Sequence, residues 1–192
     1  MNEFNRINFD SCYFLEGKIT YLRPLLKSDI RREYLSWLNN PELTTYSSHF
    51  RTFPTTEKDL ENFLERVKDS NSVVFALCCK KTGVHFGNAS IDDIDWINRN
   101  AHFNSMIGLK KYRGMHFLDI MNVMTNYAFN TLNLNKLTGG SEIPNLEILH
   151  KRMGWQVEGV FKNHNYLNGK YIDVVRFAIF KDDYNRITNH IL

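Results

Sequence analysis

The sequence predicts a single α/β domain in which helices flank a mixed, mostly antiparallel sheet. Strand-like and helix-like segments follow one another through 192 residues without an internal repeat, a low-complexity tract or a linker. Asn168-Gly169 separates two β-rich runs and is a strong signal for a hairpin. The hydrophobic content of 43% and the charged content of 23% are ordinary for a globular domain with one core.

The helices are predicted from their caps and their apolar stripes. A helix over residues 28–39 is expected to begin at Ser28 as its N-cap and to end before a proline. Thr56 and Asp59 have the spacing of a capping box and open a second amphipathic helix. Residues 41–54, between these helices, are interpreted as a polar and aromatic loop. Further helices are expected after Gly114 and over residues 145–153.

Strands are predicted from apolar runs that are bounded by turn residues. They are expected at residues 18–22, 73–79, 84–94, 101–108, 137–142, 156–166 and 170–180. Residues 1–17 are interpreted as an N-terminal extension and residues 183–192 as a C-terminal tail, so the domain is expected to cover residues 18–182.

Composition argues against several classes of protein. The net charge is +3 and no stripe of Lys and Arg is present, so we expect no nucleic-acid partner. No apolar stretch approaches 18 residues and no signal peptide is visible, so we expect no membrane partner and a cytoplasmic location. Cys78 and Cys79 are adjacent on a predicted strand and point to opposite faces, which suits a reducing compartment. The seven histidines include no pair with metal-ligand spacing and a carboxylate partner, so we expect no metal.

The segment YRGMHFLD, residues 112–119, has the arrangement of a phosphate-binding loop. A predicted strand precedes it and a long amphipathic helix follows it, so backbone N–H groups and the helix N-terminus converge there. Gly114 allows the backbone to approach a phosphate closely. Asp119 suits the helix dipole but would repel a nearby phosphate, so its side chain is expected to turn away.

Several segments, in order, resemble GNAT-type N-acetyltransferases. They are ITYLRPLLKSD, WLNNPEL, YRG, YAFNTLNLNKL, KRMGW, EG and NGKYID. The resemblance covers residues 18–180 and is closest to the branch of ribosomal-protein alanine acetyltransferases. It implies a single GNAT domain that uses acetyl-CoA as its donor substrate.

The resemblance implies a set of CoA-binding residues on the strand, the loop, the helix start and the following helix. They are Met106, Ile107, Gly108, Lys111, Arg113, Gly114, Met115, His116, Phe117 and Asn145. His116 stands where the family prefers a second small residue. It is expected either to weaken CoA binding or to add a donor imidazole to the N–H groups.

The resemblance also suggests catalytic residues. His150 occupies the position of a family tyrosine that protonates the leaving thiolate, and a histidine has a suitable pKa for that role; a cap on a short helix is the alternative. Asp93 and His102 are candidates for the base, together with their neighbours Asp92 and Asp95. The alternatives are a solvated hairpin approach and a reaction without a dedicated base.

Residues 41–54 are expected to form the wall of the acceptor site. The candidate substrate-binding residues are Trp37, Tyr46, His49 and Arg51. For the aromatic residues, local packing is the alternative. No acidic cluster lies there, which disfavours polyamines. Arg51 and the aromatic rings suit an anionic, ring-bearing acceptor such as a nucleotide-linked amino sugar.

The leading hypothesis is therefore acetyl-CoA-dependent N-acetylation of a small primary amine by direct transfer in a ternary complex. Acetylation of a protein N-terminus is the second hypothesis. A hypothesis of another class is a catalytically degenerate acyl-CoA-binding module. A homodimer formed through strand edges or helices is also left open.

Overall fold

The computed structural model describes residues 13–31, 33–68, 70–143 and 153–189. Within these residues the strands form one eight-stranded sheet in the order β1-β2-β3-β4-β5-β6-β8-β7. Its strands are β1 Leu15–Glu16, β2 Thr20–Pro24, β3 Val73–Cys79, β4 His85–Asp95, β5 Asn100–Ile107, β6 Lys136–Ser141, β7 Gln156–Leu167 and β8 Lys170–Phe180. β5 and β6 pair in parallel, and the other neighbours pair antiparallel. The predicted α/β class with a mixed, mostly antiparallel sheet is confirmed.

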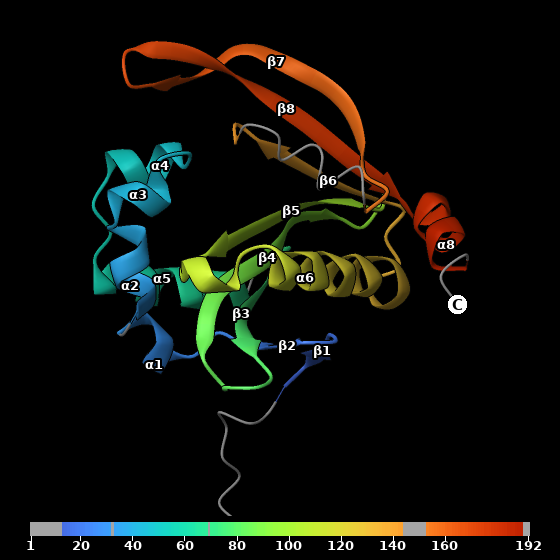
Figure 1. Ribbon diagram of the computed structural model, residues 1–192, viewed down its shortest axis with the longest axis horizontal. Helices are drawn as coiled ribbons and strands as arrows, with labels where there is room; N and C mark the ends of the chain where they lie inside the picture. The colour runs from blue at the N-terminus through green and yellow to red at the C-terminus, as the bar shows by residue number, and fades with distance from the viewer. Residues whose placement is uncertain (1–12, 32, 69, 144–152, 190–192) are drawn as a thin grey trace, which may run out of the picture.

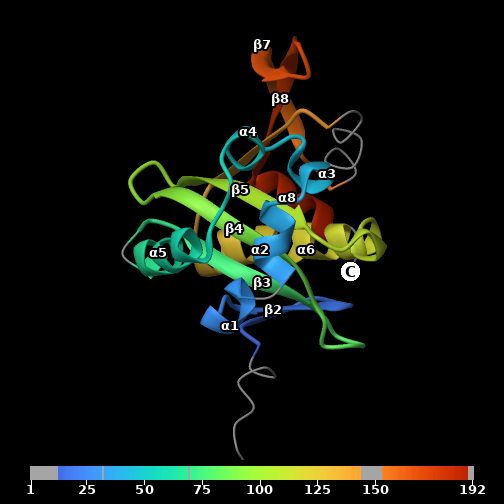
Figure 2. The same cartoon turned by 90° about the vertical axis from the view of Figure 1, so that its left-hand side faces the viewer.

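The helices lie on both faces of the sheet. They are α1 Lys27–Ile30, α2 Glu33–Leu38, α3 Pro41–Thr44, α4 Ser48–Thr52, α5 Glu57–Lys68, η2 Lys110–Tyr112, α6 Met115–Asn126, the π-helical η3 Tyr127–Thr131 and α8 Lys181–Asn189. Figure 2 shows α5 and α6 on opposite sides of β3 and β4. The apolar side of α6, with Ile120, Met121 and Met124 fully buried, forms the larger core against the sheet.

The first helix differs from the sequence prediction, because it is divided into α1 and α2 and does not begin at Ser28. Asp29 explains the earlier start. Its carboxylate accepts hydrogen bonds from both terminal nitrogens of Arg23, at 2.7 and 2.9 Å, and from the backbone N–H of Leu26, at 2.8 Å. The buried ion pair thus fixes the entry to α1 with Leu26 as its N-cap.

The interpretation of residues 41–54 as a loop is wrong, since they contain α3 and α4. Asn40 caps α3 by accepting a hydrogen bond from the N–H of Glu42, at 2.9 Å, and Pro41 stands at the first helical turn. By contrast, the capping box of α5 is confirmed: Thr56 and Asp59 exchange hydrogen bonds between side chain and backbone.

The two ends of the chain carry more structure than the sequence indicated. β1 lies inside the segment interpreted as an extension and pairs with β2, and α8 begins before the segment interpreted as a tail. Near the C-terminal end, Asn168 and Gly169 both have positive φ angles, 49° and 84°, which confirms the predicted hairpin between β7 and β8.

One irregularity of the sheet positions the candidate site. β5 and β6 pair only over residues 100–102 and 136–138, and beyond this point β6 pairs with β8 alone. The two strands then diverge toward α3 and α4 (Figure 1). We call this opening, beyond the pair of His102 and Thr138, the β5–β6 wedge. The chain leaves β5 at the wedge and enters α6 through the Arg-Gly segment.

Candidate active site

The segment between β5 and α6 has the geometry of an anion cradle. Gly114 has a φ of +79°, in the left-handed region that side chains disfavour, and a Cβ added there would meet no heavy atom within 4 Å. Gly114 immediately precedes α6, whose first N–H groups have no partner inside the helix. Positive backbone charge and open space therefore coincide at Gly114, as a pyrophosphate requires.

His116 does not cover this cradle. Its ring packs edge-on against the rings of Phe86 and Tyr112, with centroid distances of 5.5 and 5.0 Å. Tyr112 is itself buried and stacks on Phe86 at 4.6 Å. The imidazole is therefore part of an aromatic cluster beneath the helix start, so the space that the family keeps clear with a small residue is not filled by its ring.

The cations around the cradle differ in their surroundings. Lys110 Nζ lies 3.1 Å from a Glu42 carboxylate oxygen, and Lys111 Nζ lies 5.0 Å from the centroid of the Tyr112 ring. Arg113 is exposed, and no residue in the described ranges forms an ion pair with it. Arg113 is thus the side chain best able to reach a bound phosphate.

Asp119 turns away from the cradle, as expected. Its carboxylate accepts hydrogen bonds from the backbone N–H groups of Lys18, Ile19 and Thr20, at 2.8–2.9 Å, and from the Thr20 hydroxyl, at 2.6 Å. Burial raises the pKa of Asp119, but these four hydrogen bonds outweigh it and hold the pKa below its ordinary value. Asp119 therefore anchors α6 to the β1–β2 turn.

The end of β5 is held from one side and open on the other. The N–H groups of Gly108 and Leu109 both donate to the carbonyl of Phe86, at 2.9 and 3.2 Å. Met106 and Ile107 pair with β4 in register. On the side toward β6, pairing stops at His102, so the later backbone groups of β5 border the wedge, where an extended ligand can bind them.

Trp37 supports this strand end from beneath. A Cβ on Gly108 would lie 2.1 Å from the indole, so the ring packs directly on the glycine backbone. The ring also contacts His85, at a centroid distance of 5.1 Å, and the residue is only 4% exposed. Trp37 thus shapes the site from inside the protein and presents little surface to an acceptor.

The face of the sheet opposite α6 carries a group of polar side chains that we call the polar face. The strand registers place them side by side on β4, β5, β6 and β8: Ser90, Asp92, His102, Asn104, Thr138 and Arg176. The Asp92 carboxylate accepts hydrogen bonds from the Ser90 hydroxyl, at 2.6 Å, and from the Asn104 amide, at 2.8 Å. The polar face reaches the inner end of the wedge at His102.

Arg176 reaches the polar face because β6 has a glycine opposite it. A Cβ on Gly140 would lie 2.8 Å from a guanidinium nitrogen of Arg176, so the arginine crosses β6 at this point. Its guanidinium carbon lies 5.6 Å from the centroid of the Phe161 ring. Thr138 and Arg176 were not among the predicted site residues. The pairing of β5 with β6 spans the α6 crossover, and no local pattern in the sequence reveals its register.

The predicted base candidates occupy different positions. His102 is partly buried on the polar face, and burial lowers its pKa below the ordinary value; Arg176 lowers it further, while Asp92, Asp93 and the Asn104 amide raise it. Asp93 is exposed at an irregularity in β4, with a φ of +54°. His102 therefore has the more enclosed position, and Asp93 acts on it from the strand end.

The predicted acceptor residues lie around α4. The Arg51 guanidinium donates one hydrogen bond to the carbonyl of Thr45 and another to the carbonyl of Tyr166, the latter at 2.6 Å. It thereby joins α4 to the tip of the β7–β8 hairpin. Figure 1 shows the tip of the β7–β8 hairpin above α4, on the same side of the molecule. Tyr46 is 38% exposed, and the His49 ring contacts two phenylalanines of its own segment. Arg51 is therefore a structural link, and Tyr46 is the more accessible ring.

Two predicted residues, His150 and Asn145, lie outside the described residues. Within the described ranges, no group of three or more His, Cys, Asp and Glu residues could hold a metal ion, and no helix is long and apolar enough to cross a membrane.

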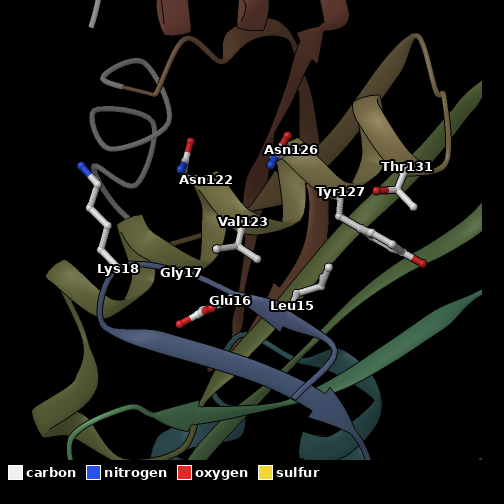
Figure 3. Close-up of a pocket in the computed structure, with 9 residues that line it drawn as sticks. All are labelled: Leu15, Glu16, Gly17, Lys18, Asn122, Val123, Asn126, Tyr127 and Thr131. Atoms are coloured by element: carbon white, nitrogen blue, oxygen red, sulfur yellow. The ribbon is translucent and has the colours of Figure 1, made fainter. Parts of the chain in front are cut away.

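A separate pocket of about 390 Å³ lies between the β1–β2 turn and α6, lined by residues such as Lys18, Asn122 and Asn126 (Figure 3). None of its lining residues belongs to β5, β6 or the cradle.

Comparison with known proteins identifies the family. Residues 20–154 match the model of an acetyltransferase (GNAT) domain. The chain is 27% identical to a spermidine N(1)-acetyltransferase of Escherichia coli strain K12, over 85% of this chain and 87% of that protein. It is 23% identical to an uncharacterized N-acetyltransferase p20 of Bacillus licheniformis, over 82% and 89% of the two chains.

The fold matches that of a solved structure. The crystal structure of spermidine N-acetyltransferase from Vibrio cholerae, in complex with CoA and spermine, superposes with a TM-score of 0.76 at 24% identity, covering 88% of this chain and 99% of that chain. The predicted family and enzyme class are confirmed, but the relatives named from Escherichia coli and Vibrio cholerae are spermidine acetyltransferases, so the comparisons do not specifically support the ribosomal-protein branch. The anion cradle, the β5–β6 wedge and the family match agree, and the chain belongs to the GNAT family as an acetyl-CoA-dependent N-acetyltransferase.

Proposed function

We propose that the protein transfers the acetyl group of acetyl-CoA directly to the primary amine of a small molecule, with both substrates bound in the β5–β6 wedge. The observation that carries the proposal is the position of the wedge between an anion cradle at Gly114 and the polar face at His102. Such an arrangement holds donor and acceptor close together and in a fixed orientation.

The donor is assigned to the cradle and the end of β5. The N–H groups of Met115, His116 and Phe117 and the side chains of Lys111 and Arg113 would hold the pyrophosphate. The pantetheine arm would pair with the β5 edge at Met106–Gly108, as a strand pairs with an open sheet edge. Asn145 stays a prediction for the same site.

We further propose an aliphatic polyamine as the acceptor class. The named relatives from Escherichia coli and Vibrio cholerae support it, and so do the carboxylates of Asp92 and Asp93 beside His102, because they favour a cationic ligand. The sequence favoured an anionic, nucleotide-linked amino sugar because of Arg51, but the Arg51 guanidinium is engaged with backbone carbonyls. The amino sugar is the second candidate, and Arg176 on the polar face favours it.

A panel of amines tests the proposal. Release of CoA thiol would be measured with acetyl-CoA and spermidine, spermine, a nucleotide-linked amino sugar or a short peptide with a free N-terminus. We expect turnover with the polyamines, and mass spectrometry would find one added acetyl group on an amine nitrogen. Turnover with the peptide alone would favour the protein N-terminus. Tight CoA binding without turnover on any amine would favour the degenerate module instead.

A further inference from the structure

Two hydrogen bonds at the inner end of the wedge determine where the proton of His102 lies. The Thr138 hydroxyl donates to the carbonyl of Ala101, at 3.0 Å. The same hydroxyl oxygen lies 3.2 Å from Nδ1 of His102. A hydroxyl has a single proton to donate. Since that proton is directed at Ala101, the oxygen must accept a proton from Nδ1, and the neutral imidazole then carries no proton on Nε2.

We propose that Thr138 is a positioning residue that fixes His102 in the Nδ1–H tautomer, so that Nε2 serves as the general base for the acceptor amine. The proposal rests on the proposed function. It assigns a second residue, on another strand, to the same reaction.

The reaction balances with this assignment. The amine nitrogen forms a bond to the thioester carbon, and the C–S bond breaks with its electron pair going to the CoA sulfur. The proton lost by the nitrogen passes to Nε2 of His102, which becomes an imidazolium and later releases a proton to solvent. The sulfur takes up a solvent proton, so the products are the amide and CoA thiol.

The surroundings suit a base that begins neutral and becomes charged. Burial and Arg176 disfavour the charged ring, so His102 is neutral when the acceptor binds. Asp92 and Asp93 on β4 and the Asn104 amide on β5 favour the imidazolium once it forms. Asp92 is held in place by the Ser90 hydroxyl and the Asn104 amide.

The backbone makes the Thr138 contact rigid. His102 and Thr138 are partners in the parallel register of β5 and β6 and form the last pair before the strands diverge. A β-branched side chain on a strand has few rotamers, so the hydroxyl stays directed at its two partners. The contact orients the ring at the point where the wedge begins.

The tautomer itself can be measured without turnover. In ¹⁵N NMR of the full-length protein above the pKa of His102, we expect the ring signals of a protonated Nδ1 and an unprotonated Nε2, assigned by comparison with His102→Gln. In Thr138→Val this preference should be lost. A protonated Nε2 in the unmodified protein would overturn the proposal, whether or not any amine is acetylated.

Kinetics separate positioning from a general structural effect. We expect Thr138→Val to lower kcat about tenfold, because the general base is no longer held in place. Thr138→Ser keeps the hydroxyl and should retain kcat within about twofold of the value for the unmodified enzyme. In the His102→Gln background, Thr138→Val should change kcat less than about twofold, because the residue acts through His102. Equal losses in both backgrounds would contradict the assignment.

The pH profile supplies a third readout. In the unmodified enzyme kcat/KM should rise with pH as His102 loses its proton, at a pH below the ordinary histidine value. Thr138→Val should move this limb to lower pH, because the imidazolium loses a stronger, charge-assisted hydrogen bond from Nδ1–H than the neutral ring does. A limb that moves to higher pH would contradict the assignment. If no amine is acetylated at all, the proposed function and the base role both fail, while NMR still decides the tautomer.

Discussion

The donor side and the acceptor side of the wedge are built in different ways. The donor side is a continuous stretch, residues 106–117, in which backbone groups, a left-handed glycine and a helix start make the contacts. The acceptor side is an assembly of side chains from β4, β5, β6 and β8, with α4 and the β7 tip beyond them. Backbone recognition of phosphate needs only local sequence, whereas amine recognition depends on the register of distant strands.

The largest effect is expected at Gly114, where phosphate binding depends on the absence of a side chain. Gly114→Val would place a branched side chain in the open space above the first N–H groups of α6. We expect the Kd for CoA, measured by calorimetry, to rise about 30- to 100-fold, because several charge-assisted hydrogen bonds are lost together.

Gly83→Val is the matched control for this change. Gly83 also has a positive φ, +69°, and open space around it, but it lies in the β3–β4 turn. Both variants place a β-branched residue at a positive φ, so a comparable loss of CoA affinity in Gly83→Val would mean that backbone strain, and not exclusion of phosphate, is responsible.

The difference between local and long-range contacts also explains how much of the fold and of the site could be predicted from the sequence. The loop at Gly114, the capping box at Thr56 and the Asn168-Gly169 hairpin were predictable because each depends on a few consecutive residues. The start of the first helix was not, because it depends on an ion pair between Asp29 and Arg23 of β2. The link that Arg51 forms with Tyr166 was not predictable for a related reason, since the two residues lie 115 positions apart in the sequence.

The second effect concerns the anchor of the donor helix. Asp119→Ala removes the acceptor of four hydrogen bonds at the β1–β2 turn, three of them from backbone N–H groups. We expect a loss of about 1–3 kcal/mol in the free energy of unfolding, measured with urea, because these donors remain unpaired. Glu65→Ala, at an exposed position on α5, should change stability far less.

The same carboxylate makes stability depend on pH. Its pKa is lowered in the folded protein, so the unfolded chain binds the proton more readily. The stabilisation is complete above the ordinary carboxyl value of 3.8 and is lost as the pH falls from there through the lower folded pKa. The gap in stability between the unmodified protein and Asp119→Ala should therefore narrow only below about pH 4. A gap that narrows at neutral pH would contradict this role.

The third effect tests the link between α4 and the β7–β8 hairpin. Arg51→Met keeps a long apolar side chain but loses the hydrogen bonds to the carbonyls of Thr45 and Tyr166. We expect the KM for the acceptor to rise about three- to tenfold. Each hydrogen bond from a charged donor contributes about 1.5–3 kcal/mol, and part of this free energy keeps α4 and the hairpin in the arrangement that binds the acceptor. The Kd for CoA should be unchanged. Arg66→Met, at an exposed position on α5, is the control, and an equal rise there would rule out this role for the link.

The smallest effect tests whether the two sides are separate. The Lys110–Glu42 ion pair joins the donor segment directly to α3, and both side chains are about 70% exposed. Solvent and salt screen such pairs, so we expect Lys110→Met to change the Kd for CoA and the KM for the acceptor less than about twofold. A double-mutant cycle with Glu42→Gln, measured at low and high salt, checks this. A fivefold change in the acceptor KM that vanishes in high salt would mean that the donor cradle and the acceptor wall are electrostatically coupled through this pair.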